Sequence, residues 1–116
     1  MYRTILVPLD GSEVAASVLD KVVALARGYQ ARLLLLTVGQ PVRLEQDEAR
    51  RVQLTLTFQA EAYLKRLHAY LEAQGLEVST TVCIGEPACE ILDMAERHHV
   101  DLIVINSRGG GGAASC

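Results

Sequence analysis

Residues 3–12 read Arg-Thr-Ile-Leu-Val-Pro-Leu-Asp-Gly-Ser, a short apolar run followed by a polar turn. The run Thr4–Leu9 is too short for a stable helix and is almost continuously aliphatic, as in strands that are covered on both faces. Asp-Gly-Ser is a frequent turn sequence, and the Ser12 hydroxyl can cap the free backbone N–H groups of a following helix. This stretch predicts a buried strand that leads through a tight turn into a helix.

The same pattern of a strand followed by a helix continues along the chain. Three further runs have strand composition: Arg32–Val38, Val78–Cys83 and Leu102–Ile105. The segments between the strands place apolar residues at steps of three and four, which is the period of an amphipathic helix. Strands that alternate with helices predict an α/β fold with an open, doubly wound, Rossmann-like parallel sheet. The third strand alternates more between apolar and polar residues, so we expect it at an edge of the sheet.

The sequence also predicts where each helix ends and which face it buries. We expect the first helix from near Ser12 to Gly28, the second up to Gly75 in a left-handed cap, and the third from Pro87 to His98-His99. The expected inward residues are Ala15, Val18, Leu19, Val22, Val23 and Ala26 in the first helix, Ala49, Val52, Leu56, Ala60, Tyr63, Leu67 and Leu71 in the second, and Ile91, Leu92 and Ala95 in the third.

The composition describes one small domain without a strong charge. The chain has 116 residues, half of them hydrophobic, and its 11 Lys and Arg residues are balanced by 14 Asp and Glu residues. Nucleic acids and acidic membranes are bound mainly through clusters of cations, so we expect neither as a partner. No apolar run approaches the about 20 residues that a membrane-spanning helix needs, and no export signal is visible, so we expect a cytoplasmic protein.

The last residues of the chain differ from the rest in composition. Residues 108–116 contain four glycines followed by small residues, which bury too little surface to offset the entropy of ordering them. We therefore expect an α/β domain over residues 1–107 and a flexible, glycine-rich tail over residues 108–116.

Candidate chemistry is confined to the carboxyl ends of the strands, where open α/β sheets bind their ligands. Asp10 follows the first strand, at a place where a carboxylate can accept hydrogen bonds from ribose hydroxyls. Serine and glycine N–H groups near residues 107–112 follow the fourth strand and can surround phosphate oxygens. Together these groups suggest a nucleotide. On these residues alone, however, Asp10 is more typical of a turn, and the glycine run is equally typical of a loose tail.

Three segments support a resemblance that spans the chain: residues 3–13, the turn Gly85-Glu86-Pro87, and residues 100–109, which read Val-Asp-Leu-Ile-Val-Ile-Asn-Ser-Arg-Gly. In this order they resemble the universal stress protein family. The resemblance implies a parallel sheet of strand order 3-2-1-4-5 with helices on both faces, and one branch of the family binds ATP between strands one and four. The sequence stops before the family's fifth strand and last helix, so we expect the order 3-2-1-4.

The resemblance to the ATP-binding branch implies which residues hold the nucleotide. These are Pro8, Leu9, Asp10, Val38, Asn106, Ser107, Arg108 and Gly109. Pro8, Asp10 and Val38 would hold adenine and ribose, with Asp10 as the ribose partner. Asn106 stands where the family's phosphate motif has glycine, and the final Gly-Ser/Thr pair of that motif would fall beyond Cys116. The implied cofactor is ATP or AMP, with Mg²⁺ in the case of ATP, bound weakly or not at all without the following helix N-terminus.

The sequence gives no sign of an efficient enzyme. Neither of its two lysines, Lys21 and Lys65, follows the glycine run as a Walker A motif requires. The three histidines have no metal-ligand spacing on one helix face. A flavin site would need a hydroxyl- and glycine-rich loop after the first strand and aromatic residues around it, but only Asp10-Gly11-Ser12 stands there and aromatic residues make up 4% of the chain. We therefore expect no catalytic residue and no metal site, and at most the slow ATP hydrolysis that the family resemblance implies.

Two functions follow from these observations. The first is a stress-response module that binds an adenine nucleotide through a degenerate site between strands one and four. The alternative is a protein-interaction or regulatory module with a vestigial crevice and a regulatory protein partner. In both cases the open edge at Leu102–Ile105, and a sheet face covered by the third helix alone, predict a homo-oligomer.

Overall fold

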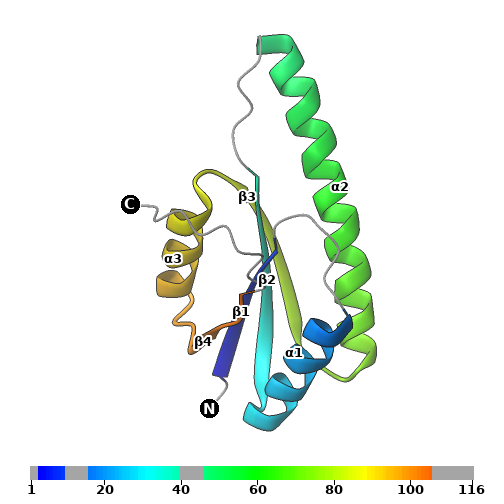
Figure 1. Ribbon diagram of the computed structural model, residues 1–116, viewed down its shortest axis with the longest axis vertical. Helices are drawn as coiled ribbons and strands as arrows, with labels where there is room; N and C mark the ends of the chain where they lie inside the picture. Colours follow the sequence, from blue (N-terminus) through cyan, green and yellow to red (C-terminus); the bar gives the residue numbers. More distant parts are fainter. Residues whose placement is uncertain (1–2, 10–15, 40–45, 106–116) are drawn as a thin grey trace.

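The computed structural model describes residues 3–9, 16–39 and 46–105, and these form a parallel sheet with helices on both faces (Figure 1). The elements in chain order are β1 (Arg3–Leu9), α1 (Ala16–Tyr29), β2 (Ala31–Gly39), α2 (Gln46–Ala73), β3 (Val78–Ile84), α3 (Pro87–Arg97) and β4 (Leu102–Ile103). The strand order is β3-β2-β1-β4, and every neighbouring pair is parallel. The open parallel sheet, the order 3-2-1-4 and the edge position of the third strand are therefore confirmed. The fourth strand is shorter than predicted.

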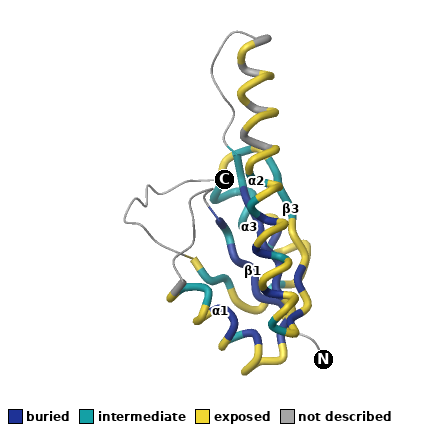
Figure 2. Tube along the Cα trace, turned by 90° about the vertical axis from the view of Figure 1, so that its right-hand side faces the viewer, coloured by how far each residue is buried: buried dark blue, intermediate teal, exposed yellow. Residues whose placement is uncertain are grey.

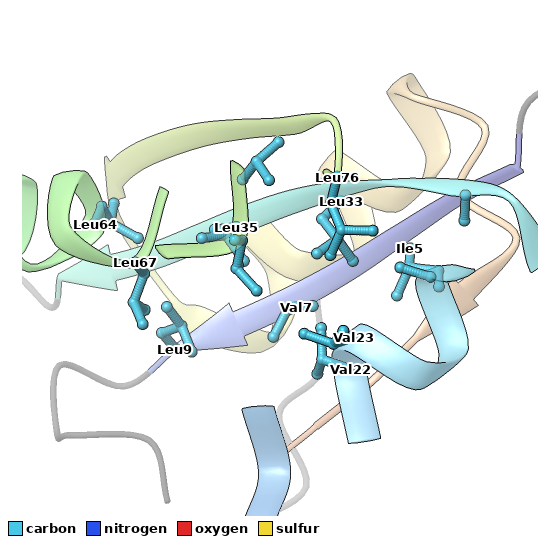
Figure 3. Close-up of a cluster of buried hydrophobic side chains, with 14 residues drawn as sticks. Ile5, Val7, Leu9, Val22, Val23, Leu33, Leu35, Leu64, Leu67 and Leu76 are labelled. Carbon is cyan, nitrogen blue, oxygen red and sulfur yellow. The ribbon is translucent and has the colours of Figure 1, made fainter. Parts of the chain in front are cut away.

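The sheet separates two groups of buried side chains. Alternate residues of a strand point to opposite faces. Ile5, Val7 and Leu9 of β1 thus pack with α1 and α2, whereas Leu6 packs with Met94 of α3. Figure 3 shows the larger group, in which Val22 and Val23 of α1 and Leu64 and Leu67 of α2 meet Leu33 and Leu35 of β2. The prediction that two helices cover one face and the third helix covers the other is confirmed. Ile91 and Ala95 of α3 pack against the sheet as predicted, but the prediction for Leu92 is wrong, because this side chain lies on the outer side of the helix and is exposed.

The ends of α1 and α3 show how the chain turns back into the sheet. The prediction that Gly28 ends α1 is wrong, because the helix continues through Tyr29 and Gln30 takes the left-handed conformation, with φ of 51°. Ala31 is buried at the start of β2, so the chain must reverse within a single residue of the helix end. Gly75 is left-handed, with φ of 83°, as predicted for the end of α2. His99, at the predicted end of α3, is also left-handed, with φ of 49°.

The two halves of α2 have different surroundings. Leu64, Leu67 and Leu71 are buried against the sheet, but Val52, which the helical pattern placed on the inward face, is exposed. The reason is that the N-terminal half of the helix extends past the end of the sheet (Figures 1 and 2), so the helical pattern continues beyond the strands that bury the C-terminal half. Tyr63 is half-buried. The predicted start of α1 and the side chains of Ala49 and Leu56 lie outside the described residues.

Candidate functional site

The described part of the site lies at the carboxyl end of β1. The chain leaves β1 through α1 on one face of the sheet, and it reaches β4 from α3 on the other face. The connection from β1 to β2 and the connection from β3 to β4 therefore run over opposite faces of the sheet, on either side of the boundary between β1 and β4. In open α/β sheets this switch point is where ligands bind, outside the carboxyl ends of the strands. The position agrees with the site that the sequence predicts.

Within the described residues, the pairing of β1 with β4 ends before Pro8. Along the β4 side of β1, the carbonyl of Thr4 accepts a hydrogen bond from the N–H of Asp101 at 2.9 Å, and the carbonyl of Leu6 accepts one from Val104 at 2.9 Å. The backbone of every second residue of β1 faces β4, so the backbone of Pro8 does as well, but proline has no N–H to donate. β1 thus stays paired with β2 as far as Leu9, but Pro8 offers no N–H to β4, and β1 and β4 can separate there.

Three predicted site residues lie in the described part of the chain, and they do not all face the same way. Val38 packs on the α3 face of the sheet, and Pro8 points to that face because it alternates with the inward Leu9. Both Pro8 and Val38 are half-buried, which leaves side-chain surface for a ligand. Leu9 is only 7% exposed and packs toward α1 and α2, so any contact from Leu9 to a ligand on the other face would come from its backbone.

The other predicted site residues lie outside the described residues. They are Asp10, Asn106, Ser107, Arg108 and Gly109. The ribose role of Asp10 and the phosphate role of the residues that follow β4 therefore stay predictions, as does the division of the chain at residue 107.

A polar cluster that the sequence analysis missed joins β1 to β4 at the opposite, amino end. The carboxylate oxygen Oδ2 of Asp101 accepts a hydrogen bond from the backbone N–H of Thr4 at 2.8 Å. Arg32 donates from Nε to the Thr4 hydroxyl at 3.0 Å. Thr4 is only 4% exposed, so these bonds satisfy polar groups that have little access to water. The cluster fixes the register of β4 on β1 and thereby the position of the switch point.

A second structured turn borders the carboxyl end, between β3 and α3. Gly85 donates its N–H to the carbonyl of Gly39 at 2.8 Å, which ties the end of β3 to the end of β2. A Cβ on Gly85 would lie 2.6 Å from Oε1 of Glu90, so glycine gives this side chain room to fold back over the turn. Burial, the charge of Glu90 and a hydrogen bond with Glu90 raise the pKa of the Cys83 thiol above its ordinary value. This thiol is therefore protonated and a weak nucleophile at neutral pH.

Two negative observations apply to the described residues alone. Within residues 3–9, 16–39 and 46–105, no three His, Cys, Asp or Glu side chains are grouped so that they could hold a metal ion. No helix in this part of the chain combines the length and apolar character needed to cross a membrane.

Comparison with known proteins identifies the family. The sequence model of the Universal stress protein family matches residues 1–115. The chain belongs to this family. This universal stress protein is 30% identical to Universal stress protein YxiE of Bacillus subtilis, over 97% of its own length and 83% of YxiE.

Solved structures of universal stress proteins share the fold. UspA from Lactobacillus plantarum aligns with a TM-score of 0.81 at 24% identity, over 94% of this chain and 79% of that protein. The universal stress protein from Archaeoglobus fulgidus in complex with dAMP aligns with a TM-score of 0.72 at 22% identity, over 94% and 84% of the two chains. The Rossmann-like class that the sequence predicted is thus confirmed.

Proposed function

We propose that this universal stress protein is a stress-response module that binds an adenine nucleotide at the switch point between β1 and β4. The observation that supports the proposal most is the end of the β1–β4 pairing at Pro8, next to the half-buried Val38 on the same face. A structural neighbour from Archaeoglobus fulgidus was solved with dAMP, which supports an adenine nucleotide as the ligand class. On this proposal Pro8 and Val38 contact adenine, and Asp10 accepts hydrogen bonds from the ribose hydroxyls.

The adenosine half of the ligand is proposed to supply most of the affinity. Asn106 stands where the family's phosphate motif has its first glycine. A side chain at that position would take up space that a glycine would leave to a phosphate oxygen. Ser107, Arg108 and Gly109 would offer backbone N–H groups and one cation to the phosphates. We therefore expect ATP, with or without Mg²⁺, to bind no more than about tenfold more tightly than AMP, a difference of about 1.4 kcal/mol.

Isothermal titration of AMP, ATP and ATP with Mg²⁺ into the 116-residue chain tests the proposal. Asp10→Ala should weaken the binding of each nucleotide at least about tenfold, because it removes a charged hydrogen-bond acceptor from ribose. Asp20→Ala, which removes an exposed carboxylate from α1, is the matched control and should change nothing. Absence of binding to the folded protein, or equal effects of the two substitutions, would contradict the proposed site.

The second candidate function is a regulatory interaction module whose crevice is vestigial. It is favoured by large apolar side chains that are exposed on α3 and around β4, among them Leu92 at 58% and Ile105 at 62%. Such side chains are common on surfaces singly but are also the usual centres of protein contacts. A homo-oligomer in the cytoplasm is part of both proposals. The titration separates the two, because the interaction module predicts no nucleotide binding by a folded chain.

A further inference from the structure

The N-terminal half of α2 extends beyond the sheet (Figure 2) and carries exposed apolar side chains. Every side chain described between Glu48 and Gln59 is exposed. Phe58 is 73% exposed and Leu54 is 64% exposed, which are the largest values for large apolar side chains among the described residues. Two such side chains four positions apart lie next to each other on a helix, so they form one apolar patch.

Charged residues bracket this patch along the same line of the helix. Arg51, Leu54, Phe58 and Glu61 follow one another at steps of three, four and three, which is the spacing of a coiled-coil seam. We call these four residues the α2 stripe. Because each residue turns the helix by about 100°, the stripe lies roughly 130° around the helix from the buried residues Leu64, Leu67 and Leu71. A partner helix can therefore approach the stripe without disturbing the contact between α2 and the sheet.

The order of residues in the α2 stripe shows which partner it fits. Read from either end, the stripe has one charge, two apolar side chains and the opposite charge. An antiparallel second copy places Leu54 opposite the partner's Phe58 and Arg51 opposite the partner's Glu61. Two-fold symmetry repeats each of these contacts, so the pairing buries four apolar side chains and forms two Arg–Glu pairs. A parallel second copy would instead oppose like charges at both ends.

We propose that the chain dimerises through the α2 stripe, as an antiparallel and two-fold symmetric helix pair. The proposal is independent of nucleotide binding, and it places the interface on α2 rather than on the exposed edge of β4. Four side chains from each helix make a small interface, so we expect a dissociation constant between about 10 and 300 µM.

Sedimentation equilibrium of the 116-residue chain at about 10 µM to 1 mM measures this constant directly. Phe58→Ser and Leu54→Ser should each raise it at least about tenfold, because each removes apolar contacts at both symmetric positions. Val52→Ser is the matched control: it changes a 37% exposed apolar residue in the same half of α2, outside the α2 stripe, and should leave the constant unchanged. Far-UV circular dichroism reports whether each variant is folded.

A charge exchange tests the antiparallel arrangement itself. Arg51→Glu or Glu61→Arg alone opposes like charges twice across the interface and should raise the dissociation constant about fivefold or more. The double variant R51E/E61R restores opposite charges and should return the constant to within about threefold of the original. Lys21→Glu on α1 changes the net charge as Arg51→Glu does and should have no effect. A monomer at 1 mM, a dimer insensitive to Phe58→Ser, or a double variant without recovery would each overturn the proposal.

Discussion

The strands β1 and β4 are hydrogen-bonded to each other at the amino end of the sheet but not at its described carboxyl end. At the amino end, Asp101, next to β4, accepts a hydrogen bond from the N–H of Thr4 in β1, and Arg32 of β2 donates to the hydroxyl of the same residue. Thr4 is almost inaccessible to water. At the carboxyl end, Pro8 has no N–H to offer, and the pairing stops while β1 continues. The polar cluster fixes the register of the short strand β4 on β1. Pro8 cannot donate the hydrogen bond that would continue this pairing toward the carboxyl end. Stability should therefore depend on the amino end and ligand binding on the carboxyl end.

The largest effect is expected where β1 passes between the two ends. Leu6 has no exposed surface and packs with Leu34, Leu36 and Met94 beneath α3. Leu6→Ala should lower the free energy of unfolding by about 2–5 kcal/mol, because it leaves a cavity in that group. Urea denaturation followed by circular dichroism measures the loss. Leu92→Ala, at an exposed position of α3, should cost less than about 0.5 kcal/mol, and a similar loss for both would contradict the assigned packing.

The next effect tests the polar cluster at the amino end. Asp101→Ala leaves the buried N–H of Thr4 without its acceptor and should lower the free energy of unfolding by about 1–3 kcal/mol. Asp93→Ala is the matched control, since it removes the exposed ion pair with Arg97 on α3 and should cost less than about 1 kcal/mol. Equal losses in urea denaturation would show that the cluster does not fasten β4.

A smaller effect is expected at the carboxyl end. Pro8→Ala breaks no hydrogen bond of the folded state and mainly gives the unfolded chain more freedom, so the free energy of unfolding should fall by less than about 1 kcal/mol. The new N–H faces β4. If the strands are separated there, hydrogen exchange should show it less protected than the N–H of Leu6. Strong protection at position 8 would contradict an open end.

The smallest effect concerns the thiol beside the β3–α3 turn. The pKa of Cys83 is raised, so at pH 8 a smaller fraction of this thiol is ionised than of an ordinary cysteine. Because the thiolate is the reactive form, alkylation by iodoacetamide at this pH should be slow. Glu90→Gln removes a neighbouring charge that raises this pKa and should speed alkylation several-fold, whereas Asp93→Asn should speed it less. Peptide mass spectrometry follows Cys83 separately from the other cysteines. Unchanged rates in Glu90→Gln would contradict the contact with Glu90.

Most of the fold was predictable because apolar patterns report directly on burial. Three aliphatic runs and one run that alternates between apolar and polar residues identified the four strands, and the helical period identified the buried residues Leu67 and Leu71 of α2. The same period failed at Val52, because a helical pattern carries no information about where the sheet ends. The preference for glycine at helix ends predicted that α1 ends at Gly28. Instead Gln30 makes the turn, directly before the buried Ala31 that begins β2.

The site was predictable in part, for different physical reasons. The places of Pro8 and Val38 follow from strand order and from the alternation of side chains in parallel strands. The bond between Thr4 and Asp101 could not be predicted, since it joins residues 97 positions apart and has no periodic signal. The only local sign was an aspartate directly before an apolar run, which is equally typical of a turn.

On the proposed function, the carboxyl end of the β1–β4 pair binds the ligand, and the fastened amino end does not. A titration of ¹⁵N-labelled protein with AMP, followed by backbone amide shifts, separates the two ends in one experiment. We predict that the amides of Leu9 and Val38 move with added AMP while those of Thr4, Arg32 and Asp101 stay in place. Shifts confined to the amino end, or no shifts at about 10 mM AMP, would contradict binding of the nucleotide at the carboxyl end.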